Sequence, residues 1–439
     1  MKQTVDVNIN INHVTRVEGH GNILVNVNNG RIEQCRWQIG EAPRFFESMV
    51  RGRHYSEVAR ITSRICGICS IGHTLASVKA TEAALGINIS WQNKKLRQLI
   101  KHAENFDSHI LHVYLLAAPD LLQAKSFYPL LDVQPEVIKR ALNLKRIAHE
   151  WGSLLAGRTT HPTRIVPGGI TQIPSLSELK QLQQTLIEVL PEVDQTLQTI
   201  KALKEKVPDF DRPTEYIALA DNKTYSLYDG QVQSLYLGEK QQYEVEQYRQ
   251  ITNEYISDWS TAKYCKNKSD SYMVGALARV NINQQYLHPK ALQAATELAM
   301  NKVLTNPYLN TLAQVIEIVN SVYQSIDILD DLIQSDYAPE PLVSPEYFAS
   351  GSSAVEVPRG ILFHEYSYDD KGLCLDSNFI IPTNQNHANI QKDFEVLVPQ
   401  LLEQNNNEEE IEMALEMLVR AYDPCISCST HFLKVKFKK

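Results

Sequence analysis

Residues 4–39 alternate between apolar and polar positions, which is the period of a β-strand that buries one face. The alternation falls into short runs, and Asn28-Asn29-Gly30 separates the last two of them. A sequence of this kind is typical of a tight hairpin turn. Residues 1–40 are therefore predicted to form a small N-terminal β-sheet.

Apolar residues then recur at three- and four-residue spacing, which predicts amphipathic helices over most of the remaining chain. The predicted helices, the first of them interrupted by a cysteine motif, cover residues 55–86, 92–118, 134–156, 176–206, 241–265, 286–335, 386–403 and 407–421. Residues 209–240 are rich in Asp, Asn, Tyr and Thr and are expected to form a peripheral β-rich excursion. Residues 340–385 contain several prolines and glycines that interrupt regular structure, so loops and strands are predicted there. Residues 1–439 are thus predicted to be a single, mainly α domain with a helical bundle core and small β elements.

The overall charge excludes one class of partner. The formal net charge is -8, so the chain has no basic surface of the kind that binds nucleic acid. Residues 1–6 do not form a basic segment followed by an apolar one, and no stretch approaches the roughly 20 apolar residues of a membrane span. A cytoplasmic protein with no direct membrane insertion is expected.

The chain has seven cysteines, too few for a disulfide framework at this length. Three of them have no cysteine nearby and are expected to be buried as small hydrophobic side chains: Cys35, Cys265 and Cys374. The other four form two Cys-x-x-Cys pairs at opposite ends of the chain: Cys66 with Cys69, and Cys425 with Cys428. If the fold brings the two pairs together, four buried thiolates predict a site for a soft transition metal.

Three kinds of metal site fit two such pairs. A structural zinc site usually has its pairs about 12–20 residues apart in a small module, whereas Cys66 and Cys425 are 359 positions apart. An iron–sulfur cluster bound by all four is conceivable, but such clusters usually take several ligands from one local run. A binuclear site between the two ends of the chain is favoured, although the spacing alone leaves all three open.

The residues around the two pairs distinguish these kinds of site. The motifs Arg-x-Cys-Gly-x-Cys-x-x-x-His at 64–73 and Asp-Pro-Cys-x-x-Cys-x-x-His at 423–431 together resemble those of the large, catalytic subunit of nickel–iron hydrogenases. Further segments resemble motifs of the same family, namely residues 16–21, 45–53, 358–360 and 382–386. The resemblance covers most of the chain and implies the nickel–iron hydrogenase large-subunit fold.

This resemblance implies a nickel–iron centre. All four cysteines would bind nickel, with Cys66 and Cys425 as terminal ligands, while Cys69 and Cys428 would also bridge nickel to iron. The iron would carry carbon monoxide and cyanide ligands, which this protein cannot make itself. Soft thiolates suit nickel and low-spin iron, so the ligand chemistry agrees with the resemblance.

The resemblance also implies which residues take part in catalysis. Glu18 would be the glutamate that approaches a terminal cysteine such as Cys425 and accepts a proton as a general base. Arg359 would place its guanidinium beside the two metals, with Asp423 as its natural carboxylate partner. The expected catalytic residues are therefore Glu18, Arg359 and Cys425.

Other residues would surround the centre. Pro382 and Thr383 resemble a segment that contacts cyanide, and Thr383 offers a hydroxyl donor. His73 is positioned to donate a hydrogen bond to a bridging sulfur. Glu47 and His431 resemble the side-chain ligands of a magnesium ion, whose remaining ligands would be waters or a backbone carbonyl.

One segment departs from the pattern of many membrane-bound family members, which have His-Asp-His in the region matched by residues 106–112. Here Ser108 takes the aspartate position and Asp107 lies one residue early. Whether the hydrogen-bonding role of that aspartate near Arg359 is retained is therefore left open. With Ala-Pro-Asp at 118–120, the segment looks more like the cytoplasmic, multimeric branch that couples hydrogen to soluble carriers.

We therefore expect the catalytic subunit of a soluble nickel–iron hydrogenase, which interconverts dihydrogen with protons and electrons. The electrons would leave through a small subunit carrying an iron–sulfur cluster and then through NAD(P)- or ferredoxin-linked subunits, because the chain has no dinucleotide-binding motif of its own. The alternatives are a membrane-associated, energy-conserving hydrogenase, a hydrogen-sensing regulatory subunit and a structural zinc protein.

The C-terminal tail raises a question about maturation. In this family maturation factors insert the metals, and an endopeptidase usually trims the precursor just after the terminal histidine. Residues 432–439 follow His431 here, so the chain is either an uncut form or a precursor that is trimmed, unless the tail is an ordinary basic strand. An intact mass ending at His431 in the active protein would show trimming.

Overall fold

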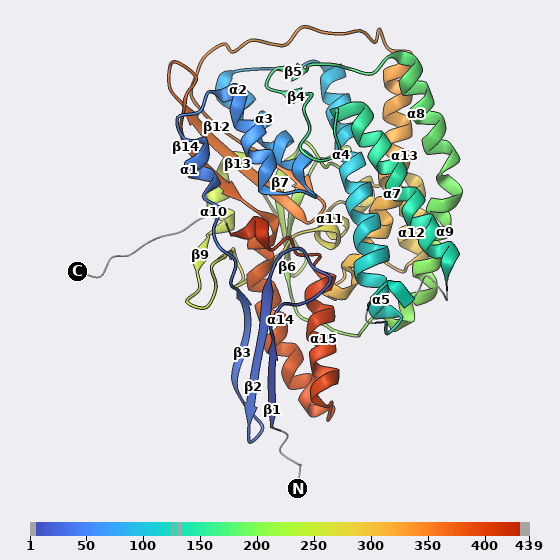
Figure 1. Ribbon diagram of the computed structural model, residues 1–439, viewed down its shortest axis with the longest axis vertical. Coiled ribbons are helices and arrows are strands. Elements are labelled where there is room, and N and C mark those ends of the chain that lie inside the picture. Colours follow the sequence, from blue (N-terminus) through green and yellow to red (C-terminus); the bar gives the residue numbers. More distant parts are fainter. Residues whose placement is uncertain (1–5, 125, 130–133, 431–439) are drawn as a thin grey trace, which may run out of the picture.

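The N-terminal sheet that the alternation predicts is present. The computed structural model describes residues 6–124, 126–129 and 134–430, and its first three strands pair antiparallel in the order β1-β2-β3. These strands are β1 (Val7–Ile11), β2 (Gly21–Asn28) and β3 (Arg31–Ile39). Asn29 and Gly30 both have positive φ, as a tight hairpin turn requires. Figure 1 shows this sheet beside two helices from the other end of the chain, α14 (Pro382–Glu403) and α15 (Glu408–Ala421).

A helical bundle makes up the right-hand side of the molecule in Figure 1. Its central member is α13 (Asn310–Gln334), which is buried along most of its length and packs against five other helices. The surrounding helices are α4 (Trp91–Leu111), α7 (Pro135–Ala156), α8 (Leu176–Glu188), α9 (Leu190–Leu203) and α12 (Pro289–Glu297). Helix α4 continues through a π-helical turn, His112–Ala117, into α5 (Ala118–Leu121).

A second antiparallel sheet lies against helix α3 (Ser70–Leu85). Its strands are β12 (Ser350–Val357), β13 (Gly360–Tyr368) and β14 (Cys374–Ile380). Helix and sheet approach closely at Gly72, where a Cβ would lie 2.2 Å from Cγ1 of Val357. The β12–β13 turn contains Arg359, so this packing brings Arg359 to the N-terminal end of α3, where the first cysteine pair lies.

The predicted β-rich excursion is confirmed as an antiparallel meander, extended by one parallel strand. The order in the sheet is β11-β6-β7-β8. Its strands are β6 (Glu215–Ala220), β7 (Gln231–Tyr236), β8 (Glu239–Tyr243) and β11 (Tyr272–Met273). The remaining short elements are α1 (Phe46–Val50), α2 (Tyr55–Thr62), α10 (Tyr248–Thr252), α11 (Ala276–Asn283), β4 (Ile165–Val166), β5 (Gly169–Ile170), β9 (Tyr255–Ile256) and β10 (Lys263–Tyr264).

Three helix predictions need correction. The predicted helix at 241–265 is wrong: α10 ends after five residues because Asn253 adopts a left-handed conformation, and β9 and β10 then pair as a hairpin. The predicted helix at 176–206 divides at Val189, since Pro191 starts a new helix. The predicted helix at 286–335 likewise divides into α12 and α13.

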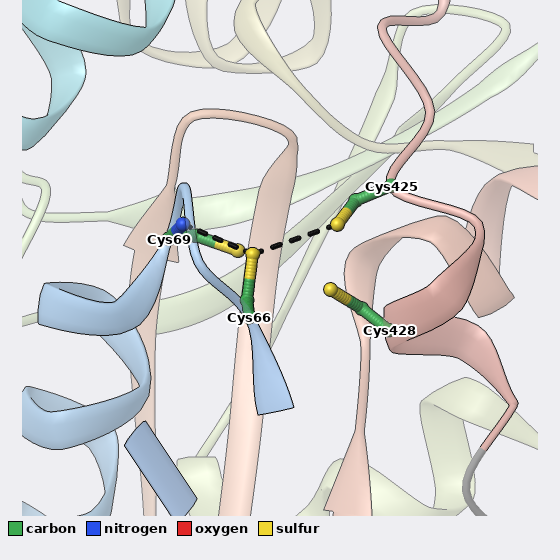
Figure 2. Close-up of side chains that lie close together, drawn as sticks. All are labelled: Cys66, Cys69, Cys425 and Cys428. Atoms are coloured by element: carbon green, nitrogen blue, oxygen red, sulfur yellow. Dashed lines mark hydrogen bonds between the residues drawn. The ribbon is translucent and has the colours of Figure 1, made fainter. Parts of the chain in front are cut away.

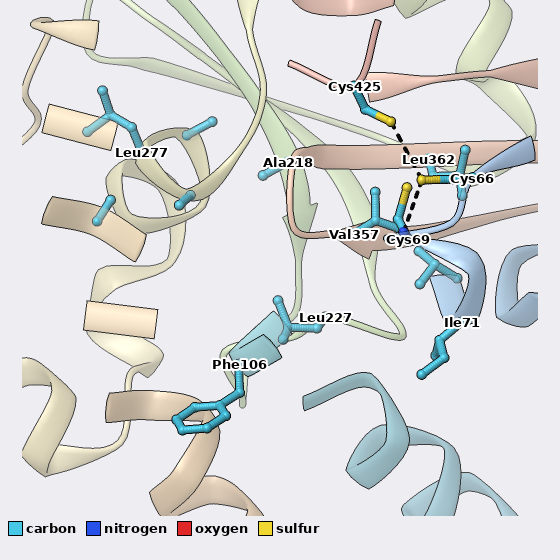
Figure 3. Packing of buried hydrophobic residues seen from close by; sticks show 14 of the residues in the cluster. Cys66, Cys69, Ile71, Phe106, Ala218, Leu227, Leu277, Val357, Leu362 and Cys425 are labelled. Atoms are coloured by element: carbon cyan, nitrogen blue, oxygen red, sulfur yellow. Dashed lines mark hydrogen bonds between the residues drawn. The ribbon is translucent and has the colours of Figure 1, made fainter. Parts of the chain in front are cut away.

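The hydrophobic core extends as far as the cysteines. One large cluster of buried side chains contains all four cysteines of the two pairs together with residues of α3, β12 and β13. Figure 3 shows Val357 and Leu362 from these strands near Cys66 and Cys69. Of the isolated cysteines, Cys265 and Cys374 are buried as predicted, whereas the prediction is wrong for Cys35, which is only partly buried on β3. Within the described residues, no helix has both the length and the apolar character needed to cross a bilayer.

Candidate metal centre

The two cysteine pairs meet, although they come from opposite ends of the sequence. The Sγ atoms of all four cysteines lie within 4.8 Å of one another, and Cys66 Sγ is 3.5 Å from Cys425 Sγ. All four side chains are buried, with at most 4% of any residue exposed. Figure 2 shows the four sulfurs pointing toward a common point from two separate segments of the chain.

The backbone conformation around the first pair positions the sulfurs of Cys66 and Cys69. Cys66 is extended after a tight helical turn, Ser63–Ile65, and Cys69 is the N-cap of α3. The backbone N–H of Cys69 donates to Cys66 Sγ at 3.0 Å. A helix N-terminus carries partial positive charge, which favours a thiolate at Cys69, but the hydrogen bond with Cys66 and burial raise the pKa of this thiol.

The second pair lies on a loop held by the N-terminal segment. Cys425 forms an isolated parallel β-bridge with Glu18, and the backbone N–H of Ile426 donates to the Glu18 carbonyl at 2.9 Å. A tight helical turn at Ser427–Ser429 then turns Cys428 inward. The Cys428 thiol donates to the Ile65 carbonyl, which directly precedes Cys66.

The four thiols cannot all ionise by themselves. Hydrogen bonding with Cys428 raises the pKa of Cys425 well above its ordinary value, and burial does the same for Cys428. Adjacent buried thiolates repel one another in a medium of low dielectric constant. A bound cation removes this repulsion, so the cluster is suited to hold a metal as thiolates.

Arg44 joins the two cysteine loops, and sequence reasoning missed it. One of its guanidinium nitrogens, Nη2, donates to the carbonyl of Ile65 at 2.7 Å and to that of Ser427 at 2.6 Å. Its backbone N–H also donates to the Thr430 carbonyl at 2.9 Å. The loops of both pairs are therefore fixed relative to each other by one side chain 22 residues before Cys66.

His387 contacts the second cysteine loop through Ser429, and this role was not predicted from the sequence. The indole N–H of Trp37 can only donate, so Nδ1 of His387 accepts it at 3.0 Å and Nε2 carries the proton. That Nε2–H donates to the Ser429 hydroxyl at 2.9 Å, and the hydroxyl donates to the Ile426 carbonyl at 2.6 Å. Burial lowers the pKa of His387 to about 3, so the ring stays neutral.

Glu18 lies directly against the second cysteine loop. Its carboxylate accepts hydrogen bonds from the backbone N–H of Ser427, at 3.1 Å, and from the Ser427 hydroxyl. Gly19 follows with φ near 85°, and a Cβ there would lie 2.7 Å from the Ser427 nitrogen. A side chain at position 19 would therefore separate Glu18 from the loop.

Arg359 and Asp423 form a buried ion pair beside the cysteines. Nη2 of Arg359 lies 2.7 Å from Oδ1 of Asp423, and both side chains are about 2% exposed. Nη1 donates to the Ser108 hydroxyl at 3.3 Å, whereas the guanidinium Nε is buried and has no hydrogen-bond partner among the described residues. Ser108 thus occupies the place beside the arginine, while Asp107 pairs with Lys145 at 2.6 Å.

Thr383 contacts the second pair through its hydroxyl oxygen. This oxygen accepts from the backbone N–H of Cys425 at 3.0 Å, which leaves the hydroxyl proton available for another acceptor. Pro382 begins α14, where a missing N–H costs nothing. Both residues are buried at the helix end nearest the second cysteine loop.

The predicted roles of His73, Glu47 and His431 stay predictions. The Nδ1 atom of His73 lies 3.2 Å from Nε2 of His364, so one of its ring nitrogens is committed to a second histidine. Glu47 is half-buried on α1, and the hydroxyl of Ser377 donates to its carbonyl. His431 and the tail at 432–439 lie outside the described residues, so the predicted magnesium pair stays a prediction.

A buried ionic cluster beneath the Arg359 turn was also missed. Arg279 forms ion pairs with Glu317 at 2.6 Å and with Glu356 at 2.8 Å, and it donates to the carbonyls of Val357 and Pro358. The Arg279 guanidinium holds the pKa of Glu317 well below its usual range despite the opposing effect of burial. This cluster fixes the backbone that carries Arg359.

Replacing Glu317 with Gln is expected to lower the free energy of unfolding by about 3–5 kcal/mol, because it removes one partner of a fully buried ion pair. Urea unfolding of the purified protein measures the change. Glu136→Gln is the matched control, since Glu136 forms an exposed pair with Lys139 worth about 1 kcal/mol or less. Equal stability of the two variants would contradict a supporting role for the cluster.

The donor set fits a thiolate-bound transition metal. Four buried sulfurs within bonding reach of a common point are the ligands of a soft metal, not of calcium or magnesium. The Nε of Arg359 adds a buried donor for which the described part of the chain provides no acceptor. An acceptor group on the metal would satisfy it.

Comparison with known proteins agrees with this chemistry. A family model described as nickel-dependent hydrogenase matches residues 44–129 and 204–431, and one described as HoxL-like matches residues 8–42. Sulfhydrogenase 1 subunit alpha of Pyrococcus furiosus is 31% identical over 97% of this chain and 98% of its own. The beta subunit of the NAD-reducing hydrogenase HoxS of Cupriavidus necator is 27% identical over 96% of this chain and 94% of its own.

Solved structures agree as well. The crystal structure of an NAD+-reducing NiFe-hydrogenase in the H2-reduced state superposes with a TM-score of 0.87 at 26% identity, covering 97% of this chain and 99% of that one. The predicted fold class is therefore confirmed. The chain belongs to the nickel-dependent hydrogenase family and is the catalytic subunit of a nickel–iron hydrogenase, an oxidoreductase acting on dihydrogen.

Proposed function

We propose that all four cysteines bind nickel, that Cys69 and Cys428 also bind iron, and that the iron carries carbon monoxide and cyanide. The burial and mutual distances of the sulfurs are the observation that carries this proposal. When bound, such a centre supplies the Lewis acidity and redox chemistry for heterolytic cleavage of dihydrogen. The protein residues around it bind, orient and move protons.

Glu18 is the proton acceptor in this proposal. Its carboxylate is fixed on Ser427, between the two cysteines of the second pair, and its backbone pairs with that of Cys425. A proton left on the Cys425 sulfur therefore has a carboxylate nearby that is only partly buried. Transfer to a positioned base of this kind contributes about 10²–10⁴-fold to turnover.

Arg359 and Thr383 orient the diatomic ligands of the iron. Both are buried and both have a donor to spare, the guanidinium Nε of Arg359 and the hydroxyl proton of Thr383. Asp423 neutralises the guanidinium and fixes its plane. Pro382 lies next to Thr383 at the start of α14, and it has no backbone N–H that would compete with these donors.

Arg359→Lys should lower hydrogen turnover by about 10–100-fold, as the loss of other outer-shell partners of metal centres does. A lysine keeps the charge facing Asp423 but loses the planar fork that also reaches Ser108. Turnover is measured with an artificial electron acceptor, so that partner subunits do not limit the rate. Arg146→Lys, at an exposed pair with Glu150, should leave the rate unchanged, and an equal rate in both variants would remove Arg359 from the proposal.

Electrons leave through a partner in this proposal. Among the described residues, the four cysteines are the only group suited to hold a metal, so an iron–sulfur cluster for electron transfer belongs to a small subunit. Similarity to an NAD-reducing hydrogenase supports a soluble acceptor, NAD(P) or ferredoxin, and hence a cytoplasmic enzyme. Maturation factors would insert the metals, Glu47 and His431 would hold magnesium, and an endopeptidase would act after His431.

The acceptor can be tested with the complex isolated through a tag on this chain. We expect hydrogen-dependent reduction of NAD(P)+ or ferredoxin and a co-purifying iron–sulfur subunit. A complex that reduces only a membrane quinone analogue would favour the membrane-associated branch. Slow turnover with every acceptor would favour a hydrogen sensor.

A further inference from the structure

A chain of buried polar side chains extends from His73 away from the metal centre. Nδ1 of His73 lies 3.2 Å from Nε2 of His364, and Nδ1 of His364 lies 2.9 Å from the hydroxyl of Tyr366. The Tyr366 hydroxyl in turn lies 2.9 Å from that of Ser77. All four residues are fully buried. His364, Tyr366 and Ser77 have no role in the proposed function.

His73 connects this chain to the thiolates. It lies in the first turn of α3, and its backbone N–H donates to the carbonyl of Cys69 at 3.1 Å. Cys69 is the N-cap of the same helix, so His73 lies one helical turn from this proposed ligand. The proton on the imidazole of His73 therefore affects the electronic environment of the metal ligands.

The directions of the hydrogen bonds that join Tyr366, His364 and His73 depend on one another. Two imidazoles can share a hydrogen bond only if one of the facing nitrogens carries a proton and the other does not. If the Tyr366 hydroxyl donates to Nδ1 of His364, a neutral His364 holds its proton on Nε2 and donates to Nδ1 of His73. A neutral His73 then holds its own proton on Nε2. Reversing the first bond reverses every later one.

Tyr366 decides the direction. Burial raises the pKa of its phenol well above the ordinary value, so the hydroxyl keeps its proton. Of its two acceptors in the chain, an imidazole nitrogen is more basic than the hydroxyl oxygen of Ser77. The phenol therefore donates to His364, and no change in net charge is needed anywhere in the chain.

We propose that His364, oriented by the Tyr366 hydroxyl, is a positioning residue that holds His73 as the Nε2–H tautomer, so that His73 presents a hydrogen-bond donor to the thiolate ligands. This inference rests on the proposed function for its effect on turnover. The tautomer of His73 itself depends only on side chains of this protein and not on the metals. The arrangement parallels the carboxylate or carbonyl that fixes a histidine tautomer in many metal sites, with a second imidazole in its place.

Three variants of the whole complex test the proposal. His364→Phe removes the donor to His73, so we expect shifted carbonyl and cyanide infrared bands and about a 10–100-fold loss of turnover at unchanged nickel content. His364→Gln keeps an amide N–H for His73 and an oxygen for Tyr366, so it should restore the wild-type bands. Ser77→Ala is the control and should leave the bands in place, because Ser77 does not set the direction.

A merely structural role for His364 predicts a different result. Both His364 variants would then lose nickel and stability together, while the loaded fraction of each would keep the wild-type bands. That outcome, or wild-type bands and turnover in a fully loaded His364→Phe enzyme, would overturn the proposal. Failure of His364→Gln to restore the bands would also count against it.

Nitrogen-15 NMR of the histidine-labelled wild-type complex reads the tautomers directly. Protonated Nε2 atoms on both His73 and His364 support the proposal, and protonated Nδ1 atoms overturn it. Assignment uses the loss of one signal in His364→Gln. A protein without nickel or carbonyl bands would refute the proposed function instead, and the tautomer result would still stand.

Discussion

Glu18→Gln is expected to lower hydrogen turnover and hydrogen–deuterium exchange by about 10²–10⁴-fold, with nickel and iron contents unchanged. Glutamine keeps the shape of the side chain and can still accept from the backbone N–H of Ser427. It cannot accept a proton at neutral pH. Exchange is the sharper measurement, because it requires cleavage of dihydrogen and proton transfer but no electron transfer to a partner.

A nearby carboxylate provides the control for this variant. Glu41 lies next to the same segment, where it accepts from the backbone N–H of His20 at 2.8 Å, but within the described residues it makes no hydrogen bond to the second cysteine loop. Glu41→Gln should keep the wild-type exchange rate. If Glu18→Gln exchanges at the wild-type rate with full metal content, protons leave by another route and the role of Glu18 is wrong.

Cys425→Ser is expected to abolish nickel binding and, with it, all hydrogen turnover. A serine hydroxyl is a hard donor that stays protonated, so it does not replace a buried thiolate on a soft metal. The loss should exceed the about 10–100-fold effect of removing an outer-shell partner. Nickel per chain is measured by elemental analysis after the protein has been produced with its maturation factors.

Cys35→Ser separates this effect from a general consequence of losing a thiol. Cys35 is partly buried on β3 and lies outside the four-sulfur cluster. That variant should retain nickel and turnover. Full nickel occupancy in Cys425→Ser would contradict the assignment of all four cysteines as ligands.

The fold was predictable where local pattern determines structure. The alternation and the Asn29-Gly30 turn specify the N-terminal hairpin without help from the rest of the chain. Residues 241–265 could not be predicted in this way, because a left-handed Asn253 ends α10 and the strands that follow depend on tertiary packing. Apolar spacing describes which residues are buried but does not show where a helix stops.

Some residues of the site were likewise predictable from the sequence and others were not. The cysteines and Glu18 lie in short motifs whose chemistry is visible locally, and the structure brings them together. Arg44 and His387 have no such motif, because each acts through contacts with residues far away in the sequence. The Arg279 cluster shows the same limit, since a buried charge and a surface charge look alike until the fold is known.

In the proposed centre, four thiolates from the two ends of the chain hold nickel and iron. Infrared spectroscopy of the purified complex, combined with elemental analysis of the same sample, tests it most directly. We expect one nickel for each catalytic chain, together with absorption bands of iron-bound carbon monoxide and cyanide. Zinc in place of nickel, with no such bands in protein made with its maturation factors, would contradict it.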